Sequence, residues 1–317
     1  MNERGSIRLL SPDVIDFGAY IAATEGTERV RNAADYVREM SARLGAGNRD
    51  DFGDALPWGP TNRFAFRPGE LTVWAGVNGH GKSMLSGMCA VQLMAARKRV
   101  CVASLEMKPQ RTLERMLRQW TGSNVGGEWV SHPEAVATLR QLYADFAGQA
   151  ADALWLYDQQ GTVRSDTMIG VARYCGEKLD IQHIFIDSLM KCVRGADDYN
   201  AQKDFVDALC AVAKDCGMHV HLVHHIRKLE NELKVPGKMD IKGAGEITDQ
   251  ADNVLVVWRN KTEAKKRQPD DPDCLLICDK QRNGSGWEGV MKLYFDPESQ
   301  QYTETRGESI DFADRCA

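Results

Sequence analysis

The sequence predicts an α/β fold in which a mostly parallel central sheet is flanked by helices and follows a short helical N-terminal extension. Two observations support this prediction. From Gly69 onward, short apolar runs alternate with helix-like stretches, which is typical of a parallel sheet covered by helices. A glycine-rich phosphate loop also lies between the first apolar run and the next helix-like stretch, where such loops occur in nucleotide-binding proteins.

The N-terminal extension comprises residues 1–55 and has no strong strand signal before about Asp54. Between residues 28 and 44, apolar side chains recur at three-four spacing, which predicts one amphipathic helix with an apolar stripe. A segment rich in Gly, Pro and Asp then connects this helix to the main domain, which we place at residues 56–300. We expect residues 301–317 to be a polar tail without fixed structure.

Within the main domain, seven apolar runs are the candidate strands, and they span residues 71–75, 100–104, 183–186, 219–223, 254–257, 275–278 and 291–294. The segment 261–273 is crowded with Lys, Arg, Pro and Asp and is interpreted as a solvated loop. A chain of 317 residues can bury one sizeable core, so nothing requires a second domain of equal size.

Composition excludes several classes of protein. The chain is 43% hydrophobic and 27% charged, which argues against a disordered or fibrous protein. No stretch approaches the roughly 18 apolar residues of a membrane span, and the first residues do not begin a secretory signal, so we expect a cytoplasmic protein. The nine cysteines are scattered through apolar runs and are interpreted as reduced thiols. Because the net charge is −5, any binding of a polyanion requires a local basic patch.

The phosphate loop predicts binding of a nucleoside triphosphate. Its glycines allow backbone N–H groups to surround the phosphates, Lys82 can reach the terminal phosphates, and the Ser83 hydroxyl can ligate Mg²⁺ at the start of a helix. The residues that we assign to this loop are Gly76, Asn78, Gly79, His80, Gly81, Lys82 and Ser83.

Two acidic residues follow candidate strands. Asp187 ends the run 183–186 and is the candidate for holding the water shell of Mg²⁺, although an acid at this point could also be a helix N-cap. Glu106 lies just past the run 100–104. A carboxylate near the terminal phosphate can orient and deprotonate the attacking water. Alternatively, Glu106 could simply open a helix.

Three histidines cluster at the end of the run 219–223, and we considered them as metal ligands. His221 and His225 project to the same side only in extended geometry, and no fourth ligand is apparent beside them and His224. We therefore assign no metal site to protein side chains other than the Mg²⁺ ligands Ser83 and Asp187.

Several motifs together resemble a known family. Ser104-Leu105-Glu106-Met107, Asp187-Ser188-Leu189 and Lys280-Gln281-Arg282-Asn283-Gly284 resemble the motor domain of DnaB-type replicative helicases. The phosphate loop and Val223-His224-His225 are more similar to the helicase half of T7-type primase-helicases and their mitochondrial relative Twinkle. The resemblance runs from about residue 57 to 294. The extension resembles neither a primase domain nor the collar domain of DnaB, so the resemblance carries no expectation of priming or of collar-mediated loading.

The resemblance implies a RecA-like P-loop NTPase, and it implies roles for individual residues. The run 100–104 would lie beside the strand that carries the phosphate loop. His225 would sense the terminal phosphate. Arg282, with Lys280 beside it, would enter the ATP site of the neighbouring subunit as an arginine finger, although a solvated arginine is the simpler alternative. Arg259 and Tyr294 would lie on either face of the adenine, although Tyr294 could equally be a core aromatic.

Two loops are candidates for contact with single-stranded DNA. One spans residues 191–203. The other spans residues 227–245 and supplies basic side chains that could follow a phosphate backbone without reading bases, although lysine-rich loops are more often only solvated. The residues assigned to DNA binding are Arg227, Lys228, Lys234, Lys238, Lys242 and Gly243.

These observations predict an ATP-driven hexameric replicative DNA helicase of phage or plasmid type that uses ATP, or another NTP or dNTP, with Mg²⁺. By resemblance it would move 5′ to 3′ on single-stranded DNA, with a separate primase, polymerase or loader as possible partners. The helix at 28–44 would dock on the neighbouring subunit. The alternatives are a RecA-like recombinase and a regulatory ATPase without unwinding, because all three share the fold. The Lys280-Gln281-Arg282 motif argues against the recombinase, and the basic loops argue against the regulatory ATPase.

Overall fold

The structure of the chain is a computed structural model. It describes residues 8–10, 33–34, 37–38, 53–59, 63–125, 133–193, 195, 198–226, 235–237, 240, 244–263, 266–284 and 286–313. Of the helix expected at 28–44, the described residues 33, 34, 37 and 38 are helical, and the rest lies outside the described residues.

A ten-stranded sheet organises the described part of the chain, in the order β1-β4-β3-β5-β6-β2-β7-β8-β9-β10. Neighbouring strands are parallel from β1 to β7, and β8, β9 and β10 add an antiparallel edge. The strands are β1 (Arg8–Leu10), β2 (Leu71–Gly76), β3 (Val100–Ser104), β4 (Leu154–Tyr157), β5 (His183–Asp187), β6 (His219–His225), β7 (Asn253–Arg259), β8 (Cys274–Gln281), β9 (Gly289–Asp296) and β10 (Gln301–Thr303).

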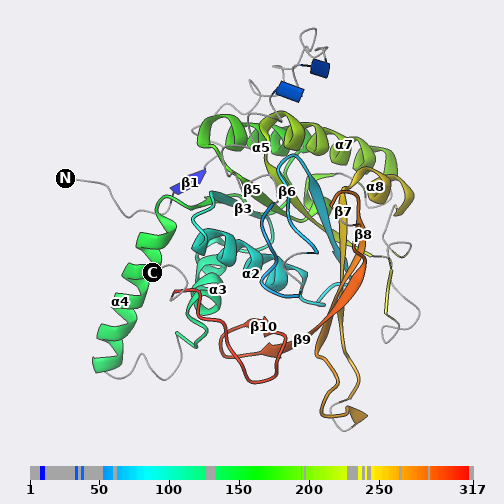
Figure 1. Cartoon of the computed structure of the whole chain (residues 1–317). Helices are drawn as coiled ribbons and strands as arrows, with labels where there is room; N and C mark the ends of the chain where they lie inside the picture. Colours follow the sequence, from blue (N-terminus) through cyan, green and yellow to red (C-terminus); the bar gives the residue numbers. More distant parts are fainter. Residues whose placement is uncertain are drawn as a thin grey trace, which may run out of the picture.

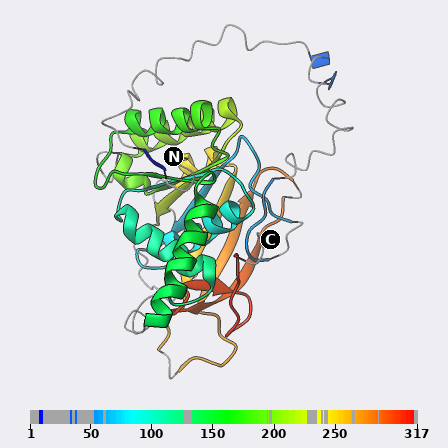
Figure 2. The same ribbon diagram turned by 90° about the vertical axis from the view of Figure 1, so that its left-hand side faces the viewer.

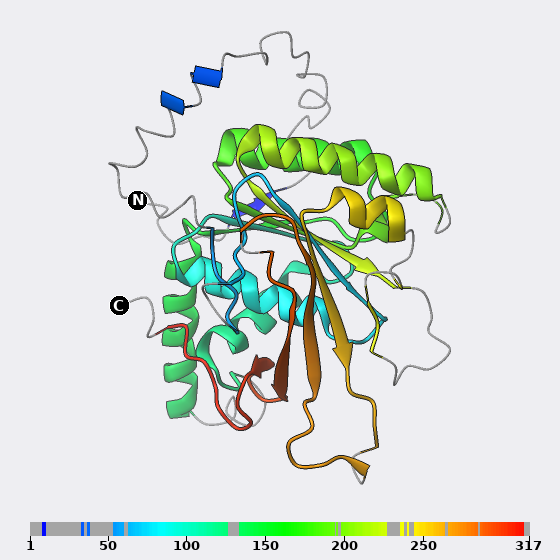
Figure 3. The ribbon, with the colours of Figure 1, turned by 45° about the vertical axis from the view of Figure 1, so that its right-hand side comes forward.

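Helices cover both faces of the sheet, as Figures 1 and 3 show. One layer contains α5, α6, α7 and α8, and the other contains α2, α3 and α4. Figure 2 shows both layers from the side. Their bounds are α2 (Lys82–Ala95), α3 (Pro109–Thr121), α4 (Pro133–Ala150), α5 (Ser165–Leu179), α6 (Leu189–Cys192), α7 (Tyr199–Cys216) and α8 (Ala244–Gln250).

Each face of the sheet has its own apolar core because side chains alternate along a strand. In β2, Leu71, Val73 and Ala75 pack in the core with α5 and α7, whereas Trp74 packs in the other core with α2 and α3. All six residues of β2 are buried, which suits a central strand covered on both faces. The strand that carries the phosphate loop is therefore held rigidly from both sides.

Local signals fix the helix ends. Gly81 precedes α2 with a φ of 93°, a conformation that glycine adopts without strain. Pro109 begins α3, where its missing N–H costs no hydrogen bond. The Asp198 carboxylate caps α7 by accepting a 3.0 Å hydrogen bond from the Ala201 N–H.

All seven expected strands are present, but three details of the expected arrangement were wrong. A strand, β1, lies in the extension, where none was expected, and it pairs with β4, which the sequence analysis also missed. The neighbours of β3 are β4 and β5, so β3 is not beside β2; β5 and β6 lie between them. The expected polar tail contains β10 and the buried Phe312, whose N–H donates to the Trp120 carbonyl at 3.0 Å.

A chain of hydrogen-bonded polar side chains, all buried except the half-buried Asp54, lies near the amino ends of β5 and β6. Trp74 Nε1 donates to His221 Nδ1 at 3.3 Å, the rings of His221 and His183 share a hydrogen bond of 3.2 Å, and His183 Nε2 lies 3.0 Å from Asp54 Oδ2. The indole can only donate and a carboxylate can only accept. The direction of every bond is therefore fixed, with both histidines neutral. Burial lowers the pKa of each of them, in agreement with this arrangement.

Among the described residues, His, Cys, Asp and Glu side chains form no cluster that could hold a metal ion. The eight described cysteines are free thiols, as expected from their apolar surroundings. None of the helices in the described part of the chain is both long and apolar enough for a membrane span.

Candidate functional site

The carboxyl ends of the central strands meet at one edge of the sheet, and this edge forms the candidate site. At the end of β2, Gly76 pairs with His225 of β6 and with Val257 of β7. Ser104 of β3 pairs with Asp187 of β5. Open α/β sheets bind ligands at this edge. A pocket of about 260 Å³ lies here, and its lining includes Asn78, Gly79, Gly81, Lys82, Ser83, Glu106, Asp187, His225 and Arg259.

The phosphate loop has the backbone that its sequence predicts. Gly79 and Gly81 have φ angles of 76° and 93°, in the left-handed region. A Cβ at Gly76 would lie 2.6 Å from the Val257 carbonyl, so a larger residue would not fit. A Cβ at Gly79 would meet nothing within 4 Å. The loop is therefore tightly packed at its base and open at its tip, where a phosphate could approach the backbone.

Lys82 is folded back onto the loop that precedes it. Its Nζ donates to the carbonyls of Gly76 at 2.9 Å and Val77 at 3.0 Å. Burial lowers the pKa of Lys82 to about 8, while Asp187 and Glu106 act in the opposite direction. A desolvated ammonium group beside an open loop is well placed to exchange its carbonyl partners for phosphate oxygens.

Ser83 and Asp187 provide an oxygen donor set that fits Mg²⁺. Burial raises the pKa of the Asp187 carboxyl, although a hydrogen bond from Ser83 lowers it. A hydroxyl and a half-buried carboxylate are ligands that Mg²⁺ accepts directly or through water. The charge of Glu106 also raises this pKa, and a divalent cation bound between these oxygens would favour the ionised carboxylate.

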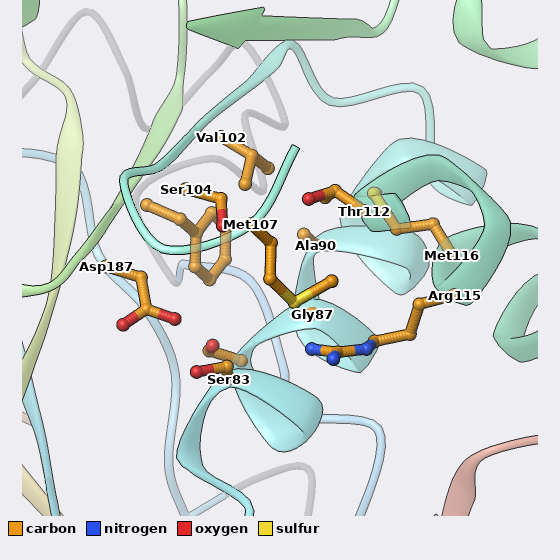
Figure 4. Close-up of a pocket in the computed structure, with 12 residues that line it drawn as sticks. Ser83, Gly87, Ala90, Val102, Ser104, Met107, Thr112, Arg115, Met116 and Asp187 are labelled. Atoms are coloured by element: carbon orange, nitrogen blue, oxygen red, sulfur yellow. The ribbon is translucent and has the colours of Figure 1, made fainter. Parts of the chain in front are cut away.

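Arg115 is a site residue that the sequence analysis did not identify. Its guanidinium, on α3, and the Asp187 carboxylate approach a small cavity of about 30 Å³ from opposite sides, with Ser83 between them (Figure 4). Burial lowers the pKa of Arg115, and Asp187 raises it. Arg115 also lines the larger pocket with Lys82 and Glu106. Its position nine residues after Glu106 becomes meaningful only when α3 folds back over the loop.

The candidate site for the base of the nucleotide differs from the expected one. Arg259 lines the pocket together with Phe295 and Tyr302, whose ring centroids are 5.0 Å apart. Tyr294 lies elsewhere, with its hydroxyl donating to the Asp270 carbonyl at 3.1 Å and the Arg306 guanidinium 4.7 Å from its ring. The structure therefore does not bring Arg259 and Tyr294 together. Adjacent strand residues point to opposite faces, and the aromatic side chain one position further along β9 is the one that lines the pocket.

His80 contacts the backbone of Arg259, one of the residues that line this side of the pocket. It is fully buried, and its Nδ1 accepts a hydrogen bond of 3.2 Å from the Arg259 N–H. This contact links the tip of the phosphate loop to the end of β7.

The matched region and this geometry identify the family. Residues 63–304 match the family described as the DnaB-like helicase C terminal domain. The chain belongs to this family.

Relatives of this DnaB-like domain carry related names. A protein of Chlamydia muridarum named "Probable plasmid replicative DNA helicase" is 25% identical over 308 residues, which cover 89% of this chain and 65% of the relative. A protein of Chlamydia trachomatis with the same name is 24% identical over 270 residues, covering 81% and 56%. The chain thus spans less than two thirds of the length of these relatives.

Solved structures share the fold of this DnaB-like domain. One of them, described as an ATPase domain, has a TM-score of 0.70 at 16% identity, with 86% of this chain and 99% of that one covered. A DnaB-like replicative helicase, solved in a study of its interactions with primase, has a TM-score of 0.68 at 15% identity, with 86% and 68% covered. These likenesses confirm the RecA-like architecture of a mostly parallel sheet flanked by helices.

Arg282 and Lys280 of the DnaB-like domain lie at the opposite end of the sheet from its own phosphate loop. β8 runs antiparallel to β7, so Gln281 pairs with Asn253, and Asn253 in turn pairs with Thr72 near the start of β2. The phosphate loop follows the other end of β2. The structure therefore does not bring the two cations into the pocket of their own subunit.

The residues assigned to DNA binding, Arg227, Lys228, Lys234, Lys238, Lys242 and Gly243, lie outside the described residues. The other candidate segment, 191–203, is described in part. Lys191 belongs to the short helix α6 and Lys203 to α7, so these two lysines lie on helices rather than on one extended loop.

Proposed function

We propose that this chain is the ATP-driven motor of a replicative DNA helicase. The observation that carries the proposal is the pocket in which a phosphate loop, Glu106, Asp187 and His225 meet, in a chain of the DnaB-like family. The nucleotide is ATP or another NTP or dNTP. Arg259, Phe295 and Tyr302 contact its base, and the phosphate loop holds its phosphates.

Each polar group in the pocket has a separate role in phosphoryl transfer. Ser83 and Asp187 would hold Mg²⁺, which would neutralise phosphate charge. Lys82 leaves the carbonyls of Gly76 and Val77 and contacts the terminal phosphates. Glu106 orients the attacking water and accepts its proton, and His225 donates a hydrogen bond to the terminal phosphate. Arg115 adds positive charge from the side of α3.

The site is completed by a neighbouring subunit in this proposal. Phosphoryl transfer is accelerated by a cation that contacts the transferred group, and an arginine finger is worth about 10³- to 10⁵-fold. Arg282 and Lys280 lie at the far end of the sheet from their own pocket, which suits cations that act on the next subunit. Hydrolysis would then require assembly of a ring, which we propose to be hexameric.

The substrate of the motor is single-stranded DNA, contacted by the basic residues of segment 227–243 in the centre of the ring. The family suggests movement from 5′ to 3′. A separate primase, polymerase or loader is a candidate partner, and the cytoplasm is the proposed location. The helix at 28–44 is proposed to dock on the neighbouring subunit; its described residue Val37 is 60% exposed, as an apolar stripe awaiting a partner would be.

Unwinding of forked DNA tests this function directly. The wild-type chain should separate a fork with ATP and Mg²⁺, and Lys82→Ala should lose ATP hydrolysis by about 10²-fold or more together with unwinding. Circular dichroism should show that the variant remains folded. Strand exchange between homologous duplexes without unwinding of the fork would favour a recombinase, and DNA-stimulated hydrolysis with neither activity would favour a regulatory ATPase.

A further inference from the structure

Arg282 forms an ion pair with a buried carboxylate, that of Asp252. Asp252 is only 4% exposed, and its Oδ1 accepts a 3.0 Å hydrogen bond from Arg282 Nη1. The backbone of Arg282 is tied to the same residue, because its N–H donates to the Asp252 carbonyl at 2.8 Å. The Arg282 side chain itself is 41% exposed. The guanidinium is therefore held from its inner side and open on its outer side.

The last carbonyls of α8 hold both cations, Lys280 and Arg282, of the hairpin that β8 and β9 form. Arg282 Nη2 donates to the carbonyls of Asp249 at 2.5 Å and Gln250 at 3.3 Å. Lys280 Nζ donates to the carbonyls of Thr248 at 2.6 Å and Asp249 at 3.1 Å. The last carbonyls of a helix lack partners within the helix and attract cations. In the chain, α8 directly follows the segment proposed to contact DNA.

Asp252 also connects Arg282 to the strand that carries the phosphate loop of its own subunit. Its second oxygen, Oδ2, accepts a 3.0 Å hydrogen bond from the Leu71 N–H, and its own N–H donates to the Leu71 carbonyl at 3.0 Å. Leu71 begins β2, and Gly76 at the other end of β2 begins the phosphate loop. At about 3.3 Å per residue, one buried strand of roughly 17 Å separates the two ends.

We infer that Asp252 is a positioning residue for Arg282, which it holds, together with the last carbonyls of α8, in the direction needed to reach the nucleotide of the neighbouring subunit. This inference rests on the proposed function of Arg282. A guanidinium has five N–H donors in a fixed plane. The bonds to Asp252, Asp249 and Gln250 occupy three of them. Nε and one Nη1 hydrogen, which lie on different edges of the group, have no acceptor among the described residues, and either can donate to a phosphate.

The fixed orientation matters because a misplaced catalytic group loses much of its effect. A displacement of about 1 Å can cost about 10²-fold in rate. A freely rotating arginine would have to be ordered at each turnover, whereas Asp252 orders it in advance.

Steady-state kinetics of Asp252→Asn, Arg282→Ala and the double variant test the inference on the assembled chain with single-stranded DNA. Asp252→Asn keeps the shape of the side chain but removes the charge that faces Arg282. The expected result is a loss of DNA-stimulated kcat of about ten- to hundredfold, with KM for ATP and affinity for DNA within about twofold of wild type. The double variant should be no slower than Arg282→Ala alone, because a positioning residue has nothing left to position.

Asp207→Asn is the matched control. Burial raises the pKa of the Cys210 thiol to about 12, and the Asp252 and Asp207 carboxylates both add to this rise, so the two acids lie near the same thiol. Asp207 is exposed on α7. Its substitution removes the same charge from the same region and should leave kcat unchanged. If Asp252→Asn does not fold, Asp252→Glu keeps the charge, displaces the carboxylate by one methylene, and should also lower kcat without changing KM.

The outcomes separate the inference from the proposed function. Full DNA-stimulated activity in Arg282→Ala would remove the proposed role of Arg282 itself. Loss in Arg282→Ala combined with normal or increased kcat in a folded Asp252 variant would overturn only the positioning role. Losses that multiply in the double variant would assign Asp252 a separate, structural effect and would also overturn the inference.

Discussion

At the scale of single residues, the site consists of charges that are only partly compensated in the protein alone. Lys82 is buried with two carbonyls as partners, and Asp187 is half-buried with a hydroxyl as partner. Removing each of these charged groups from water costs free energy, and contacts with a bound nucleotide and its cation would offset this cost. The phosphate loop itself could be predicted from the sequence, because it is a local motif. The position of Arg115 in the pocket could not be predicted from the sequence, because it depends on how α3 packs.

Glu106 is the residue whose role can be separated most cleanly from binding. Glu106→Gln keeps the volume of the side chain and removes its ability to accept a proton. The variant should bind ATP with nearly the affinity of wild type and assemble on single-stranded DNA, while its kcat falls by about 10²- to 10⁴-fold. A direct nucleotide titration alongside the ATPase assay measures both quantities. Loss of nucleotide binding would instead indicate that Glu106 supports the loop structurally.

At the scale of elements, the strands were predictable because each short apolar run is a local pattern, whereas their order was not. The pairing of β3 with β5 depends on crossover connections that no local pattern records. The same limit applies to β9, where choosing between Tyr294 and Phe295 requires the register of the strand. β1 and β10 have three residues each and acquire their structure only by pairing with β4 and β9.

The base site is tested by two adjacent aromatic residues that point to opposite faces of β9. Phe295→Ala should weaken nucleotide binding about five- to hundredfold, because stacking of a base on an aromatic ring is worth about 1–3 kcal/mol. Tyr294→Ala removes a similar aromatic group from the other face and should leave affinity within about twofold. Fluorescence titration of each variant with a labelled nucleotide decides between them. Equal losses would contradict the assignment of Phe295, and a larger loss for Tyr294→Ala would restore the original expectation.

The buried histidines of β5 and β6 predict a dependence of stability on pH. His219 lies between the Thr72 hydroxyl, 2.9 Å away, and the Arg67 carbonyl, 2.7 Å away, and burial lowers its pKa to about 3. An unfolded histidine has a pKa of about 6.5, so between these two values the unfolded chain binds the extra proton. The contribution of His219 to the free energy of unfolding should therefore be constant above about pH 7. It should fall as the pH decreases below about 6.5.

The variant His219→Gln isolates this contribution, because glutamine can also donate and accept hydrogen bonds but does not titrate. Between about pH 7.5 and about pH 5.0, wild type should lose about 2 kcal/mol more unfolding free energy than the variant. Denaturant unfolding at the two pH values measures the difference. An equal loss in both proteins would show that the pKa of His219 is not lowered in the folded protein.

At the scale of the whole molecule, the sheet separates two functional ends. The phosphate loop and Glu106 lie at one end of β2, and the hairpin with Lys280 and Arg282 lies at the other. In the proposed function, a single subunit would therefore carry the two halves of a site at opposite ends. This arrangement suits a ring in which each subunit binds nucleotide at one interface and stimulates hydrolysis at the other. The sequence motifs indicated both halves, but only the register of β8 reveals that they are apart.

Mixing of two inactive variants tests this central claim most directly. Arg282→Ala subunits keep an intact Lys82, and Lys82→Ala subunits keep an intact Arg282, so an interface between the two types rebuilds one complete site. Each variant alone should lack DNA-stimulated hydrolysis, because every one of its sites is incomplete, and the co-assembled mixture should regain part of it. Recovery in proportion to the fraction of mixed interfaces is the result that we predict. Continued inactivity of a mixture whose co-assembly has been verified, or full activity of Arg282→Ala alone, would contradict a site shared between subunits.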